Sequence, residues 1–257
     1  MSEAVHHFEA QAARYAQHAE DRPEFRERFD LWVSAIDRIA SSGTPLIAID
    51  LGSGPGHLTQ HLIESGVKTT SIDASPAMLD FTKQRLERSG ITAMDLRNHS
   101  LPLPSSVVRE FEGKAHLIVL SSVLEYIEDD DKVLRQCAQM LRQGGHLLVS
   151  LPNRSSVYWQ LQRVLRGTRL YRDSASRHQI HQYDVGTIAL TGHSNGFDLE
   201  SVVFYSLPFH RYTSRLFRGR PRHVATLFLG DFKLNGAPRQ GSDGWPGESV
   251  PGEQEQR

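Results

Sequence analysis

Residues 46–59 read LIAIDLGSGPGHLT, and this stretch decides the fold of the chain. The apolar run that ends in Asp50 is bounded by glycines, which predicts a buried β-strand. The residues from His57 to Glu64 have the pattern of a helix. Glycine lets the backbone turn sharply and approach a ligand that a Cβ atom would keep away. A strand, a glycine-rich turn and a helix N-terminus in this order predict a site for a nucleotide-like ligand.

Two common nucleotide-binding motifs do not fit this turn. Its glycines lie at alternate positions, Gly52, Gly54 and Gly56. A dinucleotide fingerprint that starts at Gly52 needs its third glycine where this chain has His57, and the Gly-Lys-Ser/Thr of a P-loop is absent from the turn. The pattern present, acidic-x-Gly-x-Gly-x-Gly, resembles motif I of the Rossmann-like S-adenosylmethionine (SAM) methyltransferases. The resemblance implies SAM as the cofactor and S-adenosylhomocysteine as its product.

The resemblance also implies which residues of the turn contact SAM. SAM has no phosphate, but it carries an α-ammonium and a sulfonium, so the carboxylate of Asp50 suits its positively charged end. The alternative is a tight turn that binds no ligand. The candidate contacts in the turn are Asp50, Gly52, Ser53, Gly54 and Gly56.

A second strand is predicted over residues 68–73, and it ends in Asp73. Rossmann-type folds place an acidic residue about twenty positions after the glycines, where its carboxylate accepts hydrogen bonds from the ribose hydroxyls. The following residues complete D-x-S-x-x-M, which resembles the second motif of the same family. Ala74 then borders the cofactor, and Met78 packs on the adenine or, alternatively, is an ordinary core methionine.

The block VLEYIEDDDKVLRQCAQMLRQGGHLLVSLPN, residues 123–153, predicts a helix that ends at Gln143-Gly144-Gly145 and then a fifth strand, HLLVSLPN. A fourth strand over 116–127 runs into a helix before it. The block resembles small-molecule methyltransferases, including the ubiquinone-biosynthesis O-methyltransferases, and the resemblance covers about residues 45–153. One departure is Ala115-His116, where the family often has Phe-Asp. Further candidate SAM contacts are Asn98, with Asp95 as its alternative, and Ser121.

Alternating strands and helices predict an α/β, Rossmann-like, seven-stranded and mostly parallel sheet with one antiparallel strand and helices on both faces. Residues 1–43 form an expected N-terminal helical cap, in which Tyr15 is a candidate for the SAM carboxylate or a packing residue. Residues 44–234 form the expected SAM-binding domain, with its last strands over 197–207 and 223–232. Residues 235–257 are rich in Gly, Pro and charge, which predicts a disordered tail.

The segment 154–185 interrupts the alternation and is the expected substrate lid, because an insertion after the fifth strand lies over the ligand-binding edge. It is rich in arginine, which suits an acidic acceptor, or a membrane surface that presents a lipophilic acceptor and is contacted transiently through 154–172. The alternative is an ordinary solvated helix. The candidate substrate contacts are Tyr158, Trp159, Arg163 and Arg166.

Methyl transfer to a hydroxyl needs alignment first and a base second. His178 and His181 follow the lid helix, and histidine is the usual base near neutral pH. Glu125 follows the fourth strand and is the other candidate. Surface histidines, and a carboxylate that stabilises a helix start, are the alternatives.

Composition narrows the function further. The formal net charge is −1, and Leu120-Ser121-Ser122-Val123 stands where base amino-methylating enzymes have Asn/Asp-Pro-Pro-Tyr/Phe, so no nucleic-acid partner is expected. The single cysteine, Cys137, lies on the apolar face of a predicted helix, which suits a reducing compartment. The sequence shows no signal pattern and no apolar run of the about 20 residues that a membrane span needs. Together these features favour the cytoplasm. We assign no metal ligands, and no pattern specifies an oligomeric state.

The predicted function is methylation of a small-molecule acceptor by SAM, most simply at oxygen. Methylation at nitrogen or carbon, protein methylation, and a non-catalytic SAM-fold subunit that binds a partner are the alternatives, because fold does not fix function.

Overall fold

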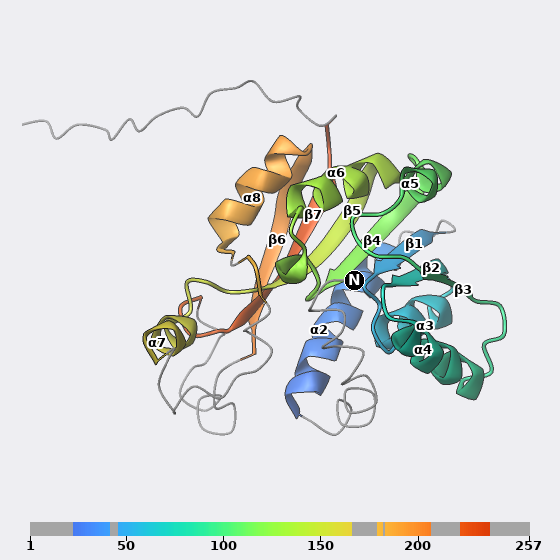
Figure 1. The fold of residues 1–257 in the computed structure, drawn as a ribbon, viewed down its shortest axis with the longest axis horizontal. Coiled ribbons are helices and arrows are strands. Elements are labelled where there is room, and N and C mark those ends of the chain that lie inside the picture. Colours follow the sequence, from blue (N-terminus) through green and yellow to red (C-terminus); the bar gives the residue numbers. More distant parts are fainter. Residues whose placement is uncertain (1–22, 42–45, 166–178, 182, 207–221, 237–257) are drawn as a thin grey trace, which may run out of the picture.

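The computed structural model describes residues 23–41, 46–165, 179–181, 183–206 and 222–236 (Figure 1). Its centre is a seven-stranded sheet with the order β3-β2-β1-β4-β5-β7-β6. The strands are β1 Ile47–Leu51, β2 Lys68–Asp73, β3 Asp95–Asn98, β4 Ala115–Ser121, β5 Leu141–Pro152, β6 Phe197–Tyr205 and β7 Leu227–Leu234. The strand predicted over 68–73 is therefore found with the same bounds.

Strands β1 to β5 pair in parallel, and β7 pairs antiparallel with both β5 and β6. This is the predicted Rossmann-like sheet, and the predicted fold class is confirmed. The order reverses between β1 and β4, since the chain adds β2 and β3 on one side of β1 and the remaining strands on the other. Ligands in open α/β sheets bind outside the carboxyl ends of the strands at such a switch point.

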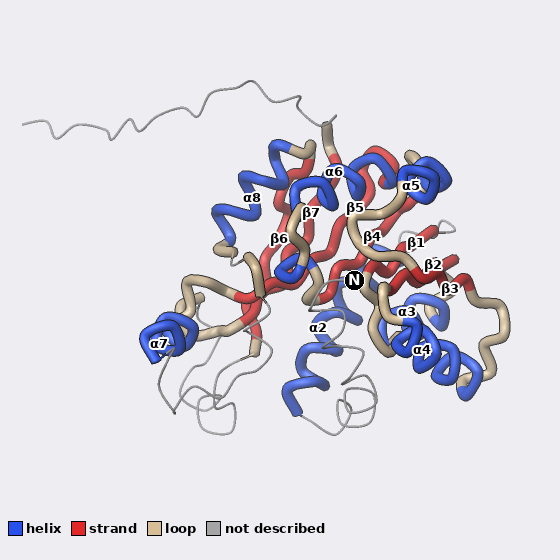
Figure 2. The backbone as a smooth tube through the Cα atoms, viewed as in Figure 1, coloured by secondary structure: helices blue, strands red, loops and turns tan. Residues whose placement is uncertain are grey.

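Helices cover both faces of the sheet (Figures 1 and 2). One face carries α2, α3 and α4, and the other carries α5, α6 and α8. Helix α7 lies apart from both layers. The helices are α2 Pro23–Ala40, α3 His57–Glu64, α4 Pro76–Arg88, α5 Ser105–Phe111, the 3-10 turn η1 Leu124–Tyr126, α6 Asp130–Met140, α7 Val157–Leu165 and α8 Val185–Ser194.

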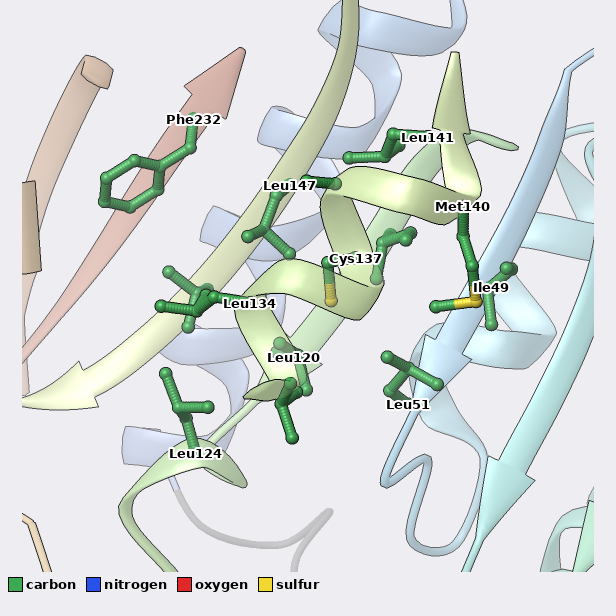
Figure 3. Close-up of a cluster of buried hydrophobic side chains, with 14 of the residues drawn as sticks. Ile49, Leu51, Leu120, Leu124, Leu134, Cys137, Met140, Leu141, Leu147 and Phe232 are labelled. Carbon is green, nitrogen blue, oxygen red and sulfur yellow. The ribbon is translucent and has the colours of Figure 1, made fainter. Parts of the chain in front are cut away.

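A hydrophobic core fills each side of the sheet. Between the sheet and α6, Leu134 and Cys137 pack against residues of β4 and β5 (Figure 3). Burial raises the pKa of the Cys137 thiol to about 12, as expected for a small buried apolar residue and not for a reactive thiol. On the opposite face, Trp32 and Ile36 of α2 are fully buried against the sheet.

Helix α2 is also fixed by charge. The Arg38 guanidinium donates to the buried carboxylate of Asp231 on β7 at 2.7 Å, and His146 on β5 lies 2.8 Å from the other oxygen of that carboxylate. The apolar contacts and this ion pair together hold α2 along the sheet, with its N-terminal half near the carboxyl ends of the strands.

Two predicted details are wrong. The helix expected to end at Gln143-Gly144-Gly145 ends at Met140, and β5 already begins at Leu141 because Leu141 pairs with Ala115 across an irregularity in the β4–β5 ladder. The helix expected after the fourth strand is only the single turn η1.

Some predictions fall outside the described residues. These are the first half of the N-terminal cap with Tyr15, and nearly all of the predicted tail. Within the described residues, no helix combines the length and apolar character needed to cross a membrane.

Candidate functional site

All three glycines of the turn after β1 have positive φ angles, which non-glycine residues adopt at a cost. Two of them are also required by packing. A Cβ atom on Gly52 would lie 2.4 Å from Val123, and a Cβ atom on Gly56 would lie 2.5 Å from Thr82. These glycines therefore let the turn approach the segment after β4 on one side and α4 on the other.

Gly54 is different, because a Cβ atom there would meet nothing within 4 Å. Its amide donates to Asp73 Oδ2 at 2.8 Å, and its carbonyl accepts from the Thr82 hydroxyl at 2.8 Å. The backbone of the turn is thus held from outside, while the position that a side chain would fill is open. This cradle fits a ligand that lies directly on the backbone.

Asp73 ends β2 beside the cradle, as the sequence predicted. Its two carboxylate oxygens accept hydrogen bonds from the amides of Gly54 and Ser75, each at 2.8 Å. Burial raises the pKa of Asp73, and these backbone hydrogen bonds oppose the rise. An ionised carboxylate has about four acceptor sites, so roughly two remain for a ligand.

Asn98 lies next to Asp73 across the β2–β3 ladder. Its Nδ2 donates to the carbonyls of Asp73 and Ala74, each at 3.0 Å, which fixes the turn that follows β2. Asp95, the alternative, is at the other end of β3, where it accepts from Thr70 and Arg97. Of the two, only Asn98 is at the carboxyl edge.

The expected direct contact of Asp50 with the charged end of SAM stays a prediction, and the structure directs this carboxylate at α3. The side chain is 1% exposed, and its Oδ2 accepts from the Thr59 hydroxyl at 2.6 Å. Burial raises the pKa of Asp50 to about 7, and the negative charge of Asp73 adds a smaller rise. The hydrogen bond from Thr59 lowers the pKa but does not cancel this rise. Asp50 therefore joins β1 to α3 beneath the turn.

Two other predicted contacts support the turn from below. The Ser53 hydroxyl accepts from Ser71 Oγ on β2 at 2.7 Å. Met78 is 4% exposed in the first turn of α4, which fits the alternative of a core methionine. Ala74 is half-buried beside them.

Ser121 ends β4 and carries a contact that sequence reasoning missed. The Arg28 guanidinium, from α2, donates to Ser121 Oγ at 2.6 Å and to Ser122 Oγ at 3.1 Å. Ser122 has a φ of 55°, a strained value for a residue with a side chain. Helix α2 thus places a positive charge where β4 ends.

Glu125 lies one turn further on, in η1. It is 1% exposed, and its Oε2 has no hydrogen-bond partner among the described residues. Burial raises the pKa of Glu125 to about 8, and the positive charge of Arg28 is too weak to reverse the rise. A buried carboxyl oxygen without a hydrogen-bond partner is unusual, and carboxyl groups with a raised pKa occur frequently at functional sites.

His181 lies against the same turn. The amides of Ile180 and His181 donate to the Glu125 carbonyl at 2.8 and 3.3 Å, and His181 Nε2 lies 3.2 Å from the Glu128 carbonyl. The structure thus brings His181 and Glu125 together, although the His181 ring is directed at the backbone. His178 lies outside the described residues.

The predicted lid contains α7. The rings of Tyr158 and Trp159 meet edge to face at 5.3 Å, and the Trp159 indole donates to the Thr226 carbonyl at 2.9 Å. Arg166 and the side chain of Arg163 lie outside what the structure describes. The lid aromatics therefore belong to the β5–β7 side, apart from the glycine turn.

One face of α7 is apolar and exposed. Its residues are Val157, Leu161 and Val164.

Among the described residues, no group of three His, Cys, Asp or Glu side chains could hold a metal ion.

Comparison with curated proteins finds ubiquinone biosynthesis O-methyltransferases. The protein of Marinobacter nauticus is 30% identical over 151 residues, which are 58% of this chain and 61% of that protein. The protein of Pseudomonas paraeruginosa is 26% identical over 174 residues, 64% of this chain and 73% of that protein. The match to the first of these relatives thus spans less than two thirds of its length.

Solved structures share the fold at low identity. Magnesium protoporphyrin IX methyltransferase from Synechocystis PCC 6803, with bound S-adenosylhomocysteine, aligns with a TM-score of 0.61 at 14% identity over 82% of this chain and 85% of that one. A putative sarcosine dimethylglycine methyltransferase from Galdieria sulphuraria aligns with a TM-score of 0.60 at 15% identity over 85% and 90%.

A family model described as "Methyltransferase domain" matches residues 25–202, which is more than half of the chain. The matched range contains the glycine turn, Asp73 and Glu125. The chain therefore belongs to the methyltransferase-domain family of SAM-dependent enzymes.

Proposed function

We propose that this protein transfers a methyl group from SAM to an oxygen atom of a small-molecule acceptor. The observation that carries the proposal is the open position at Gly54, held between Asp73 and α4, with the unpaired Oε2 of Glu125 after the adjacent strand β4. The turn with its open position at Gly54 and the unpaired carboxyl oxygen of Glu125 thus lie at the same edge of the sheet.

The residues present fit SAM. The two remaining acceptor sites of Asp73 suit the vicinal hydroxyls of its ribose, and Asn98 holds the turn that carries Ala74 at the adenine side. The backbone of Gly52 and Gly54 suits the methionine part, for which no phosphate-binding cation is needed. Bound SAM supplies a methyl group on a positively charged sulfur, an electrophile that needs only an aligned acceptor.

Glu125 is the base that the geometry favours. Its Oε2 is unpaired, and its raised pKa of about 8 makes the ionised carboxylate a stronger base than an exposed one. His181 has its ring nitrogen at a backbone carbonyl and its amide on η1, which suits a residue that holds Glu125 in place. A positioned base typically contributes about 10²–10⁴-fold in rate.

The lid is proposed to select the acceptor. The exposed apolar face of α7, in a segment rich in arginine, suits an acidic or lipophilic acceptor, including one presented at an anionic membrane surface through 154–172. We also propose the division into a cap over 1–43, a SAM-binding domain over 44–234 with its lid over 154–185, and a tail over 235–257.

A screen with SAM labelled in its methyl group tests the function. The full chain is incubated with labelled SAM and pools of hydroxyl, amine and carbon-acid metabolites, and with cell protein. Label in a hydroxyl compound, lost in Glu125→Gln, is expected. Label only in amines, carbon acids or protein contradicts O-methylation, and SAM binding without any transfer indicates the non-catalytic alternative.

A further inference from the structure

Three buried polar atoms near the carboxyl edge have no hydrogen-bond partner among the described residues. They are Trp32 Nε1, Glu125 Oε2 and Tyr205 Oη, on side chains that are each 1% exposed. They come from α2, η1 and the end of β6, three distant parts of the sequence. Because each such atom costs about 1–3 kcal/mol, three that gather in one place point to a group that pairs with them.

The charge of Arg28 acts on both Glu125 and Tyr205, and Arg28 lies one helical turn before Trp32 on α2, so we name these four residues the α2 polar cluster. Burial and the negative charge of Glu125 raise the pKa of the Tyr205 phenol, while the positive charge of Arg28 opposes the rise. Ser150 and Trp32 both lie beside the phenol and oppose the rise, yet neither reaches hydrogen-bonding geometry with its Oη. The cluster therefore combines donors and one cation with a single carboxyl.

Strand order places the cluster on the acceptor side. The proposed SAM contacts follow β2 and β1, while Glu125 follows β4 and Tyr205 ends β6. In the sheet order, β6 is three strands beyond β4, and neighbouring strands are about 4.8 Å apart. The cluster thus extends away from the adenosine half of the site, beyond the strand where Arg28 holds Ser121.

We propose that the α2 polar cluster binds the reacting group of the acceptor, and that this group is an ionisable hydroxyl. The inference rests on the proposed O-methyl transfer. Trp32 Nε1 and Tyr205 Oη donate to the acceptor oxygen, and Glu125 Oε2 accepts its hydrogen. The fixed charge of Arg28 stabilises an oxygen anion and opposes an ammonium group, so the cluster discriminates against amine acceptors.

The proton and electron balance is simple. The O–H bond of the acceptor breaks, and its proton passes to the ionised carboxylate of Glu125, which becomes neutral. The oxygen keeps the electron pair and uses it to form the new bond to the methyl carbon, whose former bonding pair stays on sulfur. No metal or redox partner is required.

A binding experiment with a phenol probe tests the cluster independently of turnover. The full chain is saturated with S-adenosylhomocysteine and titrated with para-nitrophenol, whose ionised form is visible by absorbance, and with para-nitroaniline, which has no corresponding anion. The variants are Trp32→Phe and Tyr205→Phe. Ser34→Ala, an exposed change on the same helix, is the control.

Wild-type protein is expected to bind para-nitrophenol in its ionised form and to bind para-nitroaniline more weakly. Each of the two variants should weaken the binding of para-nitrophenol about tenfold, because each loses one hydrogen bond to a charged oxygen. The affinity for S-adenosylhomocysteine should not change. Tyr205→Phe deletes only a hydroxyl without a partner among the described residues, so its melting temperature should not fall, whereas Trp32→Phe also removes part of a buried core side chain and should melt at a lower temperature. Ser34→Ala should match wild type.

Three results overturn the inference. These are no para-nitrophenol binding by wild type, equal binding by wild type and both variants, and a loss of S-adenosylhomocysteine affinity in the variants, which would assign the cluster to SAM. Absence of S-adenosylhomocysteine binding by wild type is a different result, because it contradicts the proposed function itself.

Discussion

The open position at Gly54 allows a sharp test of the cofactor site. The substitution Gly54→Ala adds one methyl group where the structure has nothing within 4 Å. Gly113 is a matched control, since its φ of 64° is close to the 53° of Gly54 and its Cβ position is equally open, but it lies in the loop between α5 and β4.

The two substitutions should cost the same stability. Neither creates a clash, so each adds only the penalty of a left-handed backbone for alanine, about 1–2 kcal/mol. In Gly54→Ala the new methyl group also competes with bound SAM for space. Overpacking by one methyl group costs about 1–3 kcal/mol, which corresponds to a roughly 5- to 150-fold loss of affinity.

The assay combines urea unfolding with equilibrium dialysis of labelled SAM. Gly113→Ala should lose stability and keep wild-type affinity, and Gly54→Ala should lose a similar stability and most of its affinity. Equal SAM affinity in Gly54→Ala and wild type would refute the assignment of the open position to the cofactor. Equal affinity losses in both variants would show that the effect is a general one on the fold.

Three further predictions concern other residues. Asp73→Asn should weaken SAM binding about tenfold or more, measured by dialysis, because it removes ribose acceptors; unchanged affinity contradicts this. Burial raises the pKa of Glu125 from 4.5 to about 8, so stability should fall as pH rises through that interval, by at most about 5 kcal/mol, and urea unfolding of Glu125→Gln should lack this fall. Replacing Arg163 and Arg166 with Ala should raise KM for the acceptor and leave SAM affinity unchanged; unaltered KM favours a solvated helix.

The sequence was sufficient for the parts of the site that are local. The bounds of β2 and the start of α3 follow from an apolar run beside glycines, and Asp73 follows from its distance to them. Asn98 could be proposed but not chosen over Asp95, because the choice depends on which end of β3 reaches the edge. That end is fixed by pairing with β2, a contact between segments.

The rest of the site depends on contacts between distant segments. The hydrogen bond from Arg28 to Ser121 joins residues 93 positions apart, and no spacing rule connects them. Asp50 was expected at the ligand, but the Thr59 hydroxyl, nine positions later, draws its carboxylate inward. The unpaired oxygen of Glu125 can be recognised only when the neighbouring residues in the fold are known. The sequence alone does not show which of the many carboxyl groups is buried.

The most direct test of the central claim is a calorimetric titration of the full chain with S-adenosylhomocysteine, alongside Asp73→Asn. Wild type should bind one molecule per chain, and Asp73→Asn should bind clearly more weakly while unfolding as a single cooperative transition. Absence of heat from binding at millimolar S-adenosylhomocysteine, with the wild-type chain folded, would contradict a SAM site at the glycine turn.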